Sequence, residues 1–135
     1  MELCPYLNFD GQCAAAFRFY EQLLGGKIVM LQTHGESPMK DQVSADWRDK
    51  VIHARLVVGD KVLMGSDAPP TRYAKPQGMT VSVTAPQADA ERIFKAFADG
   101  GAVTMPFAKT FWSAGFGMVV DRFGIPWMVS SEQAA

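Results

Sequence analysis

The apolar and polar positions of this chain follow one pattern twice. Residues 15–26 read AAFRFYEQLLGG and residues 90–101 read AERIFKAFADGG, and each segment follows an alternating stretch and precedes another. A shift of 75 positions aligns Gly25-Gly26 with Gly100-Gly101. Since a fixed internal period marks a duplicated supersecondary unit, the sequence predicts two copies of one module.

The first copy begins with a predicted strand over residues 3–9, in which Leu3, Leu7 and Phe9 are apolar. Apolar residues spaced by three and four then predict a helix over residues 13–24, and we expect the Asp10 carboxylate to cap its start. Further strands are predicted at 27–32, 51–58 and 61–66, the last two joined by a Gly59-Asp60 hairpin turn. The polar stretch between them, residues 33–50, is expected to be a long and mobile loop.

The second copy begins with MTVSVT at residues 79–84, whose strict alternation is typical of a strand with one buried face. A helix over 86–99 and strands at 102–105, 116–120 and 127–130 complete it. Aligning Met64 with Met128 gives an offset of 64, so the long loop is shorter in this copy. Each half is therefore predicted to be β-α-β-β-β, with module one at about 1–67, a proline-rich linker at 68–78 and module two at about 79–131.

Composition narrows the class of protein. The chain has 135 residues, enough for a single domain with a real core, and a net charge of −1. This net charge does not indicate the basic surface that binds nucleic acid or an anionic membrane. No apolar run approaches the ~20 residues of a membrane span. An acid and a proline near the N-terminus do not fit a signal peptide, so a cytoplasmic location is expected, and Cys4 and Cys13 are expected to be reduced.

Three segments carry a resemblance to a known family. These are PYLNFDG near the N-terminus, MGSD after the hairpin, and TFWSAGFGMVVDRFGIPWMVS near the end. They resemble the PhnB-like branch of the vicinal oxygen chelate superfamily, which includes glyoxalase I, bleomycin-resistance proteins and extradiol dioxygenases. The resemblance implies an α+β fold of two βαβββ modules, with mixed sheets curled around a cleft and helices on the outer faces. It also implies a homodimer, with the cleft made within one chain or by exchange between two.

Some members of this branch carry the name of a demethylubiquinone methyltransferase. The sequence contains no predicted strand followed by a GxGxG-type loop that could cradle S-adenosylmethionine, and 135 residues leave no room for such a domain. We therefore do not expect methyl transfer.

The metal ligands of the superfamily carry over by position to Leu3, Met64, Met79 and Met128. None is a ligand for a hard divalent ion, because a thioether is soft and Mg, Mn, Fe or Zn prefer imidazole or carboxylate. We therefore expect neither a metal nor another cofactor. The three methionines either fill the core or form an adaptable wall for an apolar ligand, and both interpretations stay open.

Two further groups of residues are candidates for ligand contact. His53 and Arg55 share one face of the 51–58 strand, where His53 is either a general base or a structural residue. Phe111, Trp112 and Phe116 surround small residues, which suits either close approach to a ligand or a hydrophobic dimer contact.

Three functions follow from these residues. The first is a protein that binds a small, partly hydrophobic molecule without a metal, as bleomycin-resistance proteins do. The second is a metal-dependent enzyme of the glyoxalase or dioxygenase kind, and the third is a dimeric scaffold without a ligand. The candidate ligand-binding residues are His53, Arg55, Met64, Met79, Phe111, Trp112, Phe116 and Met128.

Overall fold

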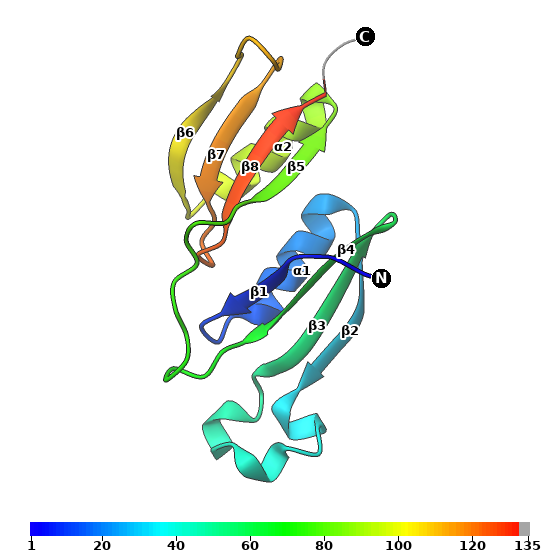
Figure 1. Cartoon of the computed structure of the whole chain (residues 1–135), viewed down its shortest axis with the longest axis vertical. Helices are drawn as coiled ribbons and strands as arrows, with labels where there is room; N and C mark the ends of the chain where they lie inside the picture. Colours follow the sequence, from blue (N-terminus) through cyan, green and yellow to red (C-terminus); the bar gives the residue numbers. More distant parts are fainter. Residues whose placement is uncertain (133–135) are drawn as a thin grey trace. The chain divides into compact units, whose positions relative to one another are not determined.

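The computed structural model describes residues 1–132, and the chain divides into two compact units, Met1–Ala74 and a second that begins at Lys75. Each unit is an open four-stranded mixed sheet with one long helix across one of its faces (Figure 1). The expected α+β class is therefore confirmed. That the sheets curl around a shared cleft stays a prediction.

The first unit has the predicted β-α-β-β-β order. Its elements are β1 (Tyr6–Phe9), α1 (Cys13–Leu24), β2 (Lys27–Thr33), β3 (Val51–Val58) and β4 (Lys61–Asp67). The strand order in the sheet is β1-β4-β3-β2, with β1 parallel to β4 and the other pairs antiparallel. The edge strands of this sheet are therefore β1 and β2.

The second unit repeats this topology. Its elements are β5 (Val81–Ala85), α2 (Gln87–Ala98), β6 (Ala102–Ala108), β7 (Phe116–Val120) and β8 (Pro126–Ser131). The order β5-β8-β7-β6, with β5 parallel to β8, matches that of the first sheet strand for strand. The duplication predicted from the sequence is thus confirmed, although β6 continues to Ala108, beyond the expected end at residue 105.

Each unit has its own core between its helix and one sheet face. In the first, the apolar stripe of α1 packs on the alternate residues of the strands; the buried side chains are Leu7, Phe9, Cys13, Ala16, Phe17, Tyr20, Leu23, Val51, Ala54, Leu56 and Leu63. A Cβ on Gly65 would lie 2.8 Å from the Leu7 carbonyl oxygen and 2.9 Å from the Phe17 ring, so only glycine lets the helix approach β4 this closely. In the second unit the Phe97 and Trp127 rings stack with centroids 4.4 Å apart.

The first strand of each unit starts later than predicted. Pro5 has no N–H to donate to the ladder and only accepts, from the Met64 amide, so β1 begins at Tyr6 rather than at residue 3. Leu3 is 95% exposed. Gly78, with a φ of +81°, turns the chain before β5, which leaves Met79 outside the strand and 81% exposed. The alternation of MTVSVT therefore overstated the length of this strand.

The start of α1 is held by a distant residue rather than by Asp10. No side chain caps this helix locally, so the predicted Asp10 cap is wrong. Instead the buried carboxylate of Asp67, at the end of β4, accepts the Cys13 N–H at 2.9 Å through Oδ1 and the Val51 N–H at 2.9 Å through Oδ2. One side chain thus ties together the beginnings of α1 and β3.

The stretch predicted as a long loop contains three short 3₁₀ turns, η1 (His34–Glu36), η2 (Lys40–Gln42) and η3 (Ala45–Trp47). Its two ends are joined by backbone hydrogen bonds, from the His34 N–H to the Lys50 oxygen at 2.9 Å and from the Gly35 N–H to the Arg48 oxygen at 2.8 Å. The sequence missed these turns because they have no apolar periodicity. The mobility of the segment stays a prediction.

Among the described residues, no helix is long and apolar enough to cross a membrane.

Candidate ligand-binding faces

Each sheet has one face against its helix, and the opposite face carries most of the candidate residues. We call these opposite faces open face one, on β1-β4-β3-β2, and open face two, on β5-β8-β7-β6. A row of directly paired residues crosses each of them. The row on open face one is Tyr6, Met64, Arg55 and Met30. The row on open face two is Ser82, Met128, Met118 and Met105. Met64 and Met128 occupy equivalent places in the two rows, as their predicted alignment requires.

Polar groups gather on open face one around His53. The Tyr6 hydroxyl lies 3.3 Å from His53 Nδ1, and the two rings stack with centroids 5.9 Å apart. If the hydroxyl donates to Nδ1, the proton of the neutral imidazole resides on Nε2. The pair therefore places a phenol and an imidazole side by side on this face, both able to exchange hydrogen bonds with a ligand.

Arg55, two residues further along β3, holds the N-terminal segment. Its Nη1 donates to Glu2 Oε1 at 2.9 Å and its Nη2 to Glu2 Oε2 at 2.6 Å, a two-pronged ion pair. The hydrogen bond from Arg55 lowers the pKa of Glu2, and the same bond raises the pKa of Arg55. Nη1 also lies 3.8 Å from the Met64 sulfur, so the guanidinium sits between a carboxylate and a thioether.

Open face two is more apolar. Phe116 lies beside Met118 and Met128 on the same side of the sheet. The Trp112 ring meets Phe116 edge-on at 5.4 Å, and Phe111 meets Trp112 at 4.7 Å. Phe111 is 96% and Trp112 45% exposed, so neither is a core residue. This aromatic group, Phe111, Trp112 and Phe116, extends the apolar surface beyond the strands.

The segment before β7 that supports this aromatic group is fixed by a buried serine. The Ser113 hydroxyl donates to the Gly115 oxygen at 2.7 Å and lies 3.0 Å from the Ser131 oxygen. Because these bonds are buried, they hold the turn against the end of β8. Ser113 therefore positions the aromatic residues and has a structural role.

The residues at the superfamily's metal positions do not fit a divalent ion. Leu3 and Met79 lie outside the strands, and the register places Tyr6 and Ser82 beside Met64 and Met128. A phenol, a hydroxyl and two thioethers make a poor set for Mg, Mn, Fe or Zn. Across residues 1–132, no group of three or more His, Cys, Asp or Glu side chains is close enough together to hold a metal.

The structure brings together some of the predicted residues and separates others. His53, Arg55 and Met64 share open face one, while Phe116 and Met128 share open face two with Phe111 and Trp112 at its border. Met79 belongs to neither face. The prediction missed Tyr6, Glu2, Met30, Met105 and Met118. The alternation of side chains along a strand could have predicted the place of Tyr6, because Leu7 and Phe9 face the core and Tyr6 must then face the opposite side. No local sequence pattern indicates the place of Glu2.

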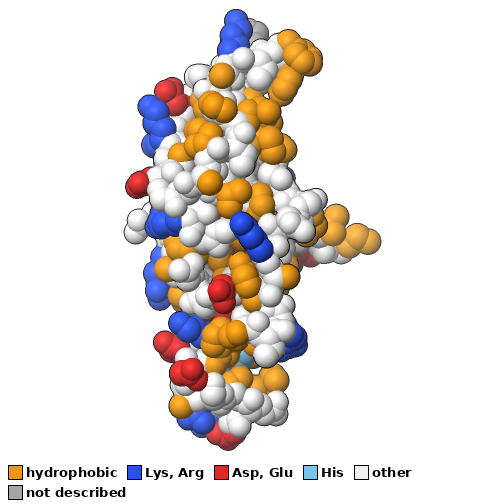
Figure 2. Space-filling model, turned by 90° about the vertical axis from the view of Figure 1, so that its left-hand side faces the viewer, with side chains coloured by type: hydrophobic (Ala, Val, Ile, Leu, Met, Phe, Trp, Pro, Cys, Tyr) orange, Lys and Arg blue, Asp and Glu red, His pale blue; other side chains and the backbone are white. Residues whose placement is uncertain are grey.

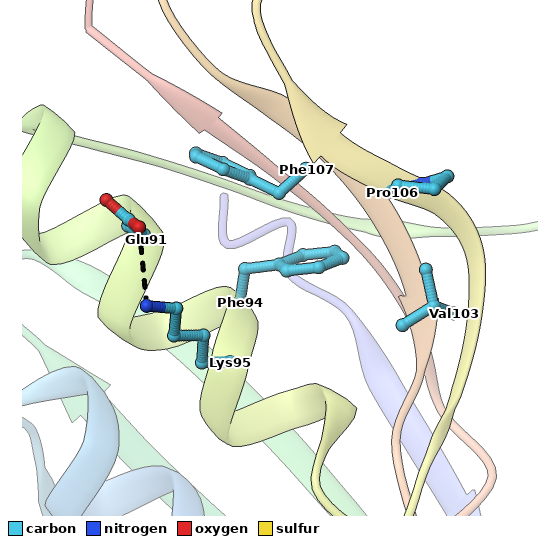
Figure 3. A pocket seen from close by; sticks show the side chains of 6 residues that line it. All are labelled: Glu91, Phe94, Lys95, Val103, Pro106 and Phe107. Atoms are coloured by element: carbon cyan, nitrogen blue, oxygen red, sulfur yellow. Dashed lines mark ion pairs between the residues drawn. The ribbon is translucent and has the colours of Figure 1, made fainter.

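A separate hollow lies on the helix side of the second unit. It has a volume of about 260 Å³ between α2 and β6, and its lining residues are Glu91, Phe94, Lys95, Val103, Pro106 and Phe107 (Figure 3). The Phe94 and Phe107 rings form its floor with centroids 5.4 Å apart, and Glu91 pairs with Lys95 at 3.3 Å at its rim. None of the predicted site residues lines it, so it is distinct from the open faces.

The charges do not gather by sign on the face of the molecule that Figure 2 presents. Figure 2 shows Lys and Arg side chains interspersed with Asp and Glu over the face that it presents, with hydrophobic side chains between them. No extended basic stripe of the kind that binds nucleic acid appears on that face.

Solved structures place this fold in a known class. The chain is similar to the protein PA1353 from Pseudomonas aeruginosa, with 47% identity, a TM-score of 0.90 and 99% of each chain covered. The fosfomycin resistance protein FosX from Listeria monocytogenes shares the fold alone, at 4% identity and a TM-score of 0.66 over 98% of this chain and 94% of that one. The fold is that of the vicinal oxygen chelate superfamily.

Sequence comparison gives the family. The family model described as 3-demethylubiquinone-9 3-methyltransferase matches residues 1–130. Protein YjdN of Escherichia coli (strain K12) is 35% identical over 139 residues, which cover 96% of this chain and 95% of that protein. The chain therefore belongs to this family, within the PhnB-like branch of the superfamily, as its motifs indicated.

The family's description names a methyltransferase, but the described residues contain no GxGxG-type loop of the kind that could cradle S-adenosylmethionine. A dinucleotide-type loop lies between a strand and a helix and needs several glycines. In the described residues the two strand-to-helix connections are Asp10-Gly11-Gln12 and Pro86, with a single glycine between them. We therefore derive no methyl-transfer chemistry for this chain.

Proposed function

We propose that this protein binds a small, partly hydrophobic molecule on its open sheet faces without the help of a divalent metal. The observation that carries this proposal is the pair of equivalent rows, Tyr6-Met64-Arg55-Met30 and Ser82-Met128-Met118-Met105. Five of the eight methionines of the chain stand in these two rows. The family and fold, which are glyoxalase/bleomycin-resistance-like, agree with such a role.

Methionine suits a surface that must adapt to a ligand. Its side chain is unbranched and polarisable, so it can fit ligands of different shapes at low cost. Met30 and Met105 stand at equivalent places on the edge strands β2 and β6 and are largely exposed, at 45% and 43%. Met64 and Met128 are themselves only partly buried, which favours the pocket interpretation over core filling for these two methionines.

The polar groups of open face one supply orientation. Binding sites for small molecules combine a mainly apolar lining with a few convergent polar groups. Tyr6, His53 and Arg55 are such groups, and they lie beside Met64 on the same face. In the described residues His53 pairs with the Tyr6 phenol and not with a carboxylate. This pairing gives no support to the alternative function, a metal-dependent enzyme.

The proposal can be tested with a neutral apolar probe, two variants of the rows and one control variant. We expect 1-heptanol to bind the chain. Met64→Gln and Met128→Gln should each weaken its binding by about five-fold, because each variant loses part of the apolar contact between the methionine side chain and the bound probe. Met39→Gln, at an exposed site in the 33–50 segment, is the matched control and should change nothing. Isothermal titration calorimetry measures these affinities; equal losses in all three variants would refute the proposal.

A metal assay addresses the alternative directly. Mass spectrometry of the purified, untagged chain should find no stoichiometric divalent metal, and thermal unfolding should not shift with any one divalent ion. A ligand that binds only the native state must raise its stability. A stoichiometric ion, or a strong shift with one ion, would favour the glyoxalase- or dioxygenase-like enzyme instead.

We also propose that the protein is a homodimer. Apolar side chains outside the two methionine rows are exposed on the edge strands of both sheets, Val29 on β2 and Val103 on β6. Exposed apolar edge strands attract further pairing unless they are covered. Sedimentation equilibrium should give twice the chain mass for the native protein, and a lower mass for the Val29→Asp/Val103→Asp double variant; a monomeric native protein would contradict the proposal.

A further inference from the structure

The carboxylate of Glu2 occupies the guanidinium of Arg55, a strong anion-binding group on open face one. Arg55 presents both of its terminal nitrogens to the two Glu2 oxygens at 2.9 and 2.6 Å. Such a fork matches the plane of a carboxylate and fixes its orientation. Glu2 reaches this position from the segment before β1, which belongs to no helix or strand.

Glu2 is placed so that another carboxylate can replace it. The side chains of Arg55 and Glu2 are 32% and 47% exposed, and exposed ion pairs are held weakly. The neighbouring Met1 and Leu3 are exposed and contribute no packing that would anchor the segment. Opening the pair therefore frees the loosely packed segment around Glu2 and disturbs no core.

We propose that Glu2 is an internal competitor for the ligand, and that the ligand carries a carboxylate that takes its place on Arg55. This inference rests on the proposed function, since it names the polar group of the molecule that binds the open face. The guanidinium also contacts the Met64 sulfur at 3.8 Å, and Met64 pairs with Tyr6 across β1 and β4. A carboxylate with a short apolar tail would thus meet a cation at one end and a thioether and a phenol ring beside it.

The competition has a measurable consequence. When a binding site is available only part of the time, the apparent affinity falls by that fraction. An exposed ion pair of ordinary strength is closed for roughly half to four-fifths of the time, so removing the Glu2 charge should tighten carboxylate binding by about two- to five-fold. A neutral ligand of the same length does not use Arg55 and should bind as before.

The experiment compares hexanoate with 1-hexanol on three forms of the full chain: the native protein, Glu2→Gln and Glu91→Gln. Glu91 pairs with Lys95 at 3.3 Å beside the hollow on the helix side of the second unit, so its variant makes the same change of net charge away from open face one. We expect Glu2→Gln to bind hexanoate about two- to five-fold more tightly than the native protein, and Glu91→Gln to match the native protein. A fourth form, Arg55→Gln, should lose the preference for hexanoate over 1-hexanol.

Each outcome has a distinct meaning. If 1-hexanol binds but Glu2→Gln leaves hexanoate affinity unchanged, or if Glu91→Gln gives the same gain, the competition is refuted while the apolar binding face stands. If neither probe binds any form, both this inference and the proposed function fail. Retained preference for hexanoate in Arg55→Gln would also refute the role of Arg55.

Discussion

Asp121→Asn changes the most heavily bonded carboxylate of the second unit by a single atom. Asp121 Oδ1 accepts the Phe123 N–H at 2.9 Å and the Ile125 N–H at 3.0 Å, while Oδ2 accepts Trp127 Nε1–H at 2.8 Å. The residue is 3% exposed, so water cannot replace these bonds. In asparagine an NH₂ group replaces one of the two carboxylate oxygens. This hydrogen-bond donor must then lie against one of the N–H groups that donated to the oxygen.

The cost follows from counting these bonds. The best arrangement keeps the amide oxygen on the two backbone N–H groups and turns its NH₂ toward the indole N–H. One bond to a charged group, worth about 1.5–3 kcal/mol, is lost, and two others are weakened by about 1 kcal/mol each because their acceptor is no longer charged. The free energy of unfolding should therefore fall by about 3.5–5 kcal/mol, a large part of the ~5–15 kcal/mol that holds a typical domain together.

Urea unfolding followed by tryptophan fluorescence measures this loss. Trp127 is fully buried beside the substitution, so a background of Trp47→Phe and Trp112→Phe isolates its signal. With a slope of about 2 kcal/mol per molar urea, the midpoint should fall by about 1.8–2.5 M. Asp60→Asn is the matched control, because Asp60 lies in an exposed turn and pairs only with Lys61 at 3.6 Å. A shift below about 0.5 M for Asp121→Asn, or equal shifts for both variants, would refute the reasoning.

Three further predictions follow from the same contacts. Gly65→Ala should lower the free energy of unfolding by about 1–3 kcal/mol in urea melts, because its new methyl group would press on backbone and a buried ring. Burial raises the pKa of the Cys13 thiol. At neutral pH a disulfide reagent should therefore modify the half-buried Cys4 first, and Cys13 only after the protein unfolds. Rapid reaction of both cysteines in the folded protein would contradict this prediction. The lowered pKa of Glu2 means that the stabilisation from its ion pair with Arg55 is fully present above the ordinary glutamate pKa and is lost as the pH falls through the lowered value. Carboxyl NMR titration should show that this pKa rises in Arg55→Gln, and no rise would contradict the pairing.

The fold could be predicted from the sequence because its signals are local. The apolar periodicity of α1 and α2, the glycines that end them and the hairpin at Gly59-Asp60 each depend on a few neighbouring residues. Boundaries were less accurate where a non-local bond decides them. The start of α1 depends on Asp67, which is 54 residues from Cys13, and no local pattern announces such a partner.

The motifs that reveal the family explain the fold better than the site. The aspartate of MGSD is Asp67, and that of DRFG is Asp121, and both are buried acceptors of backbone N–H groups. The residues of open face one come together only in space. Tyr6 and His53 are 47 residues apart, and Glu2 and Arg55 are 53 apart. Strand alternation gives the side of the sheet for each of these strand residues but not its neighbour across the sheet.

The most direct test of the central claim is NMR of the methionine methyl groups in the ¹³C-methyl-labelled chain during titration with 1-heptanol. Eight methyl signals are expected, one for each methionine. The account predicts that the signals of Met30 and Met64 shift together with one affinity, and that those of Met105, Met118 and Met128 also shift together with one affinity, each set reporting on its own open face. Met1 and Met39 should not move, and the response of Met79 tests its predicted place in the site. Shifts confined to Met1 and Met39, or no shifts at saturating probe, would contradict a ligand-binding role for the open faces.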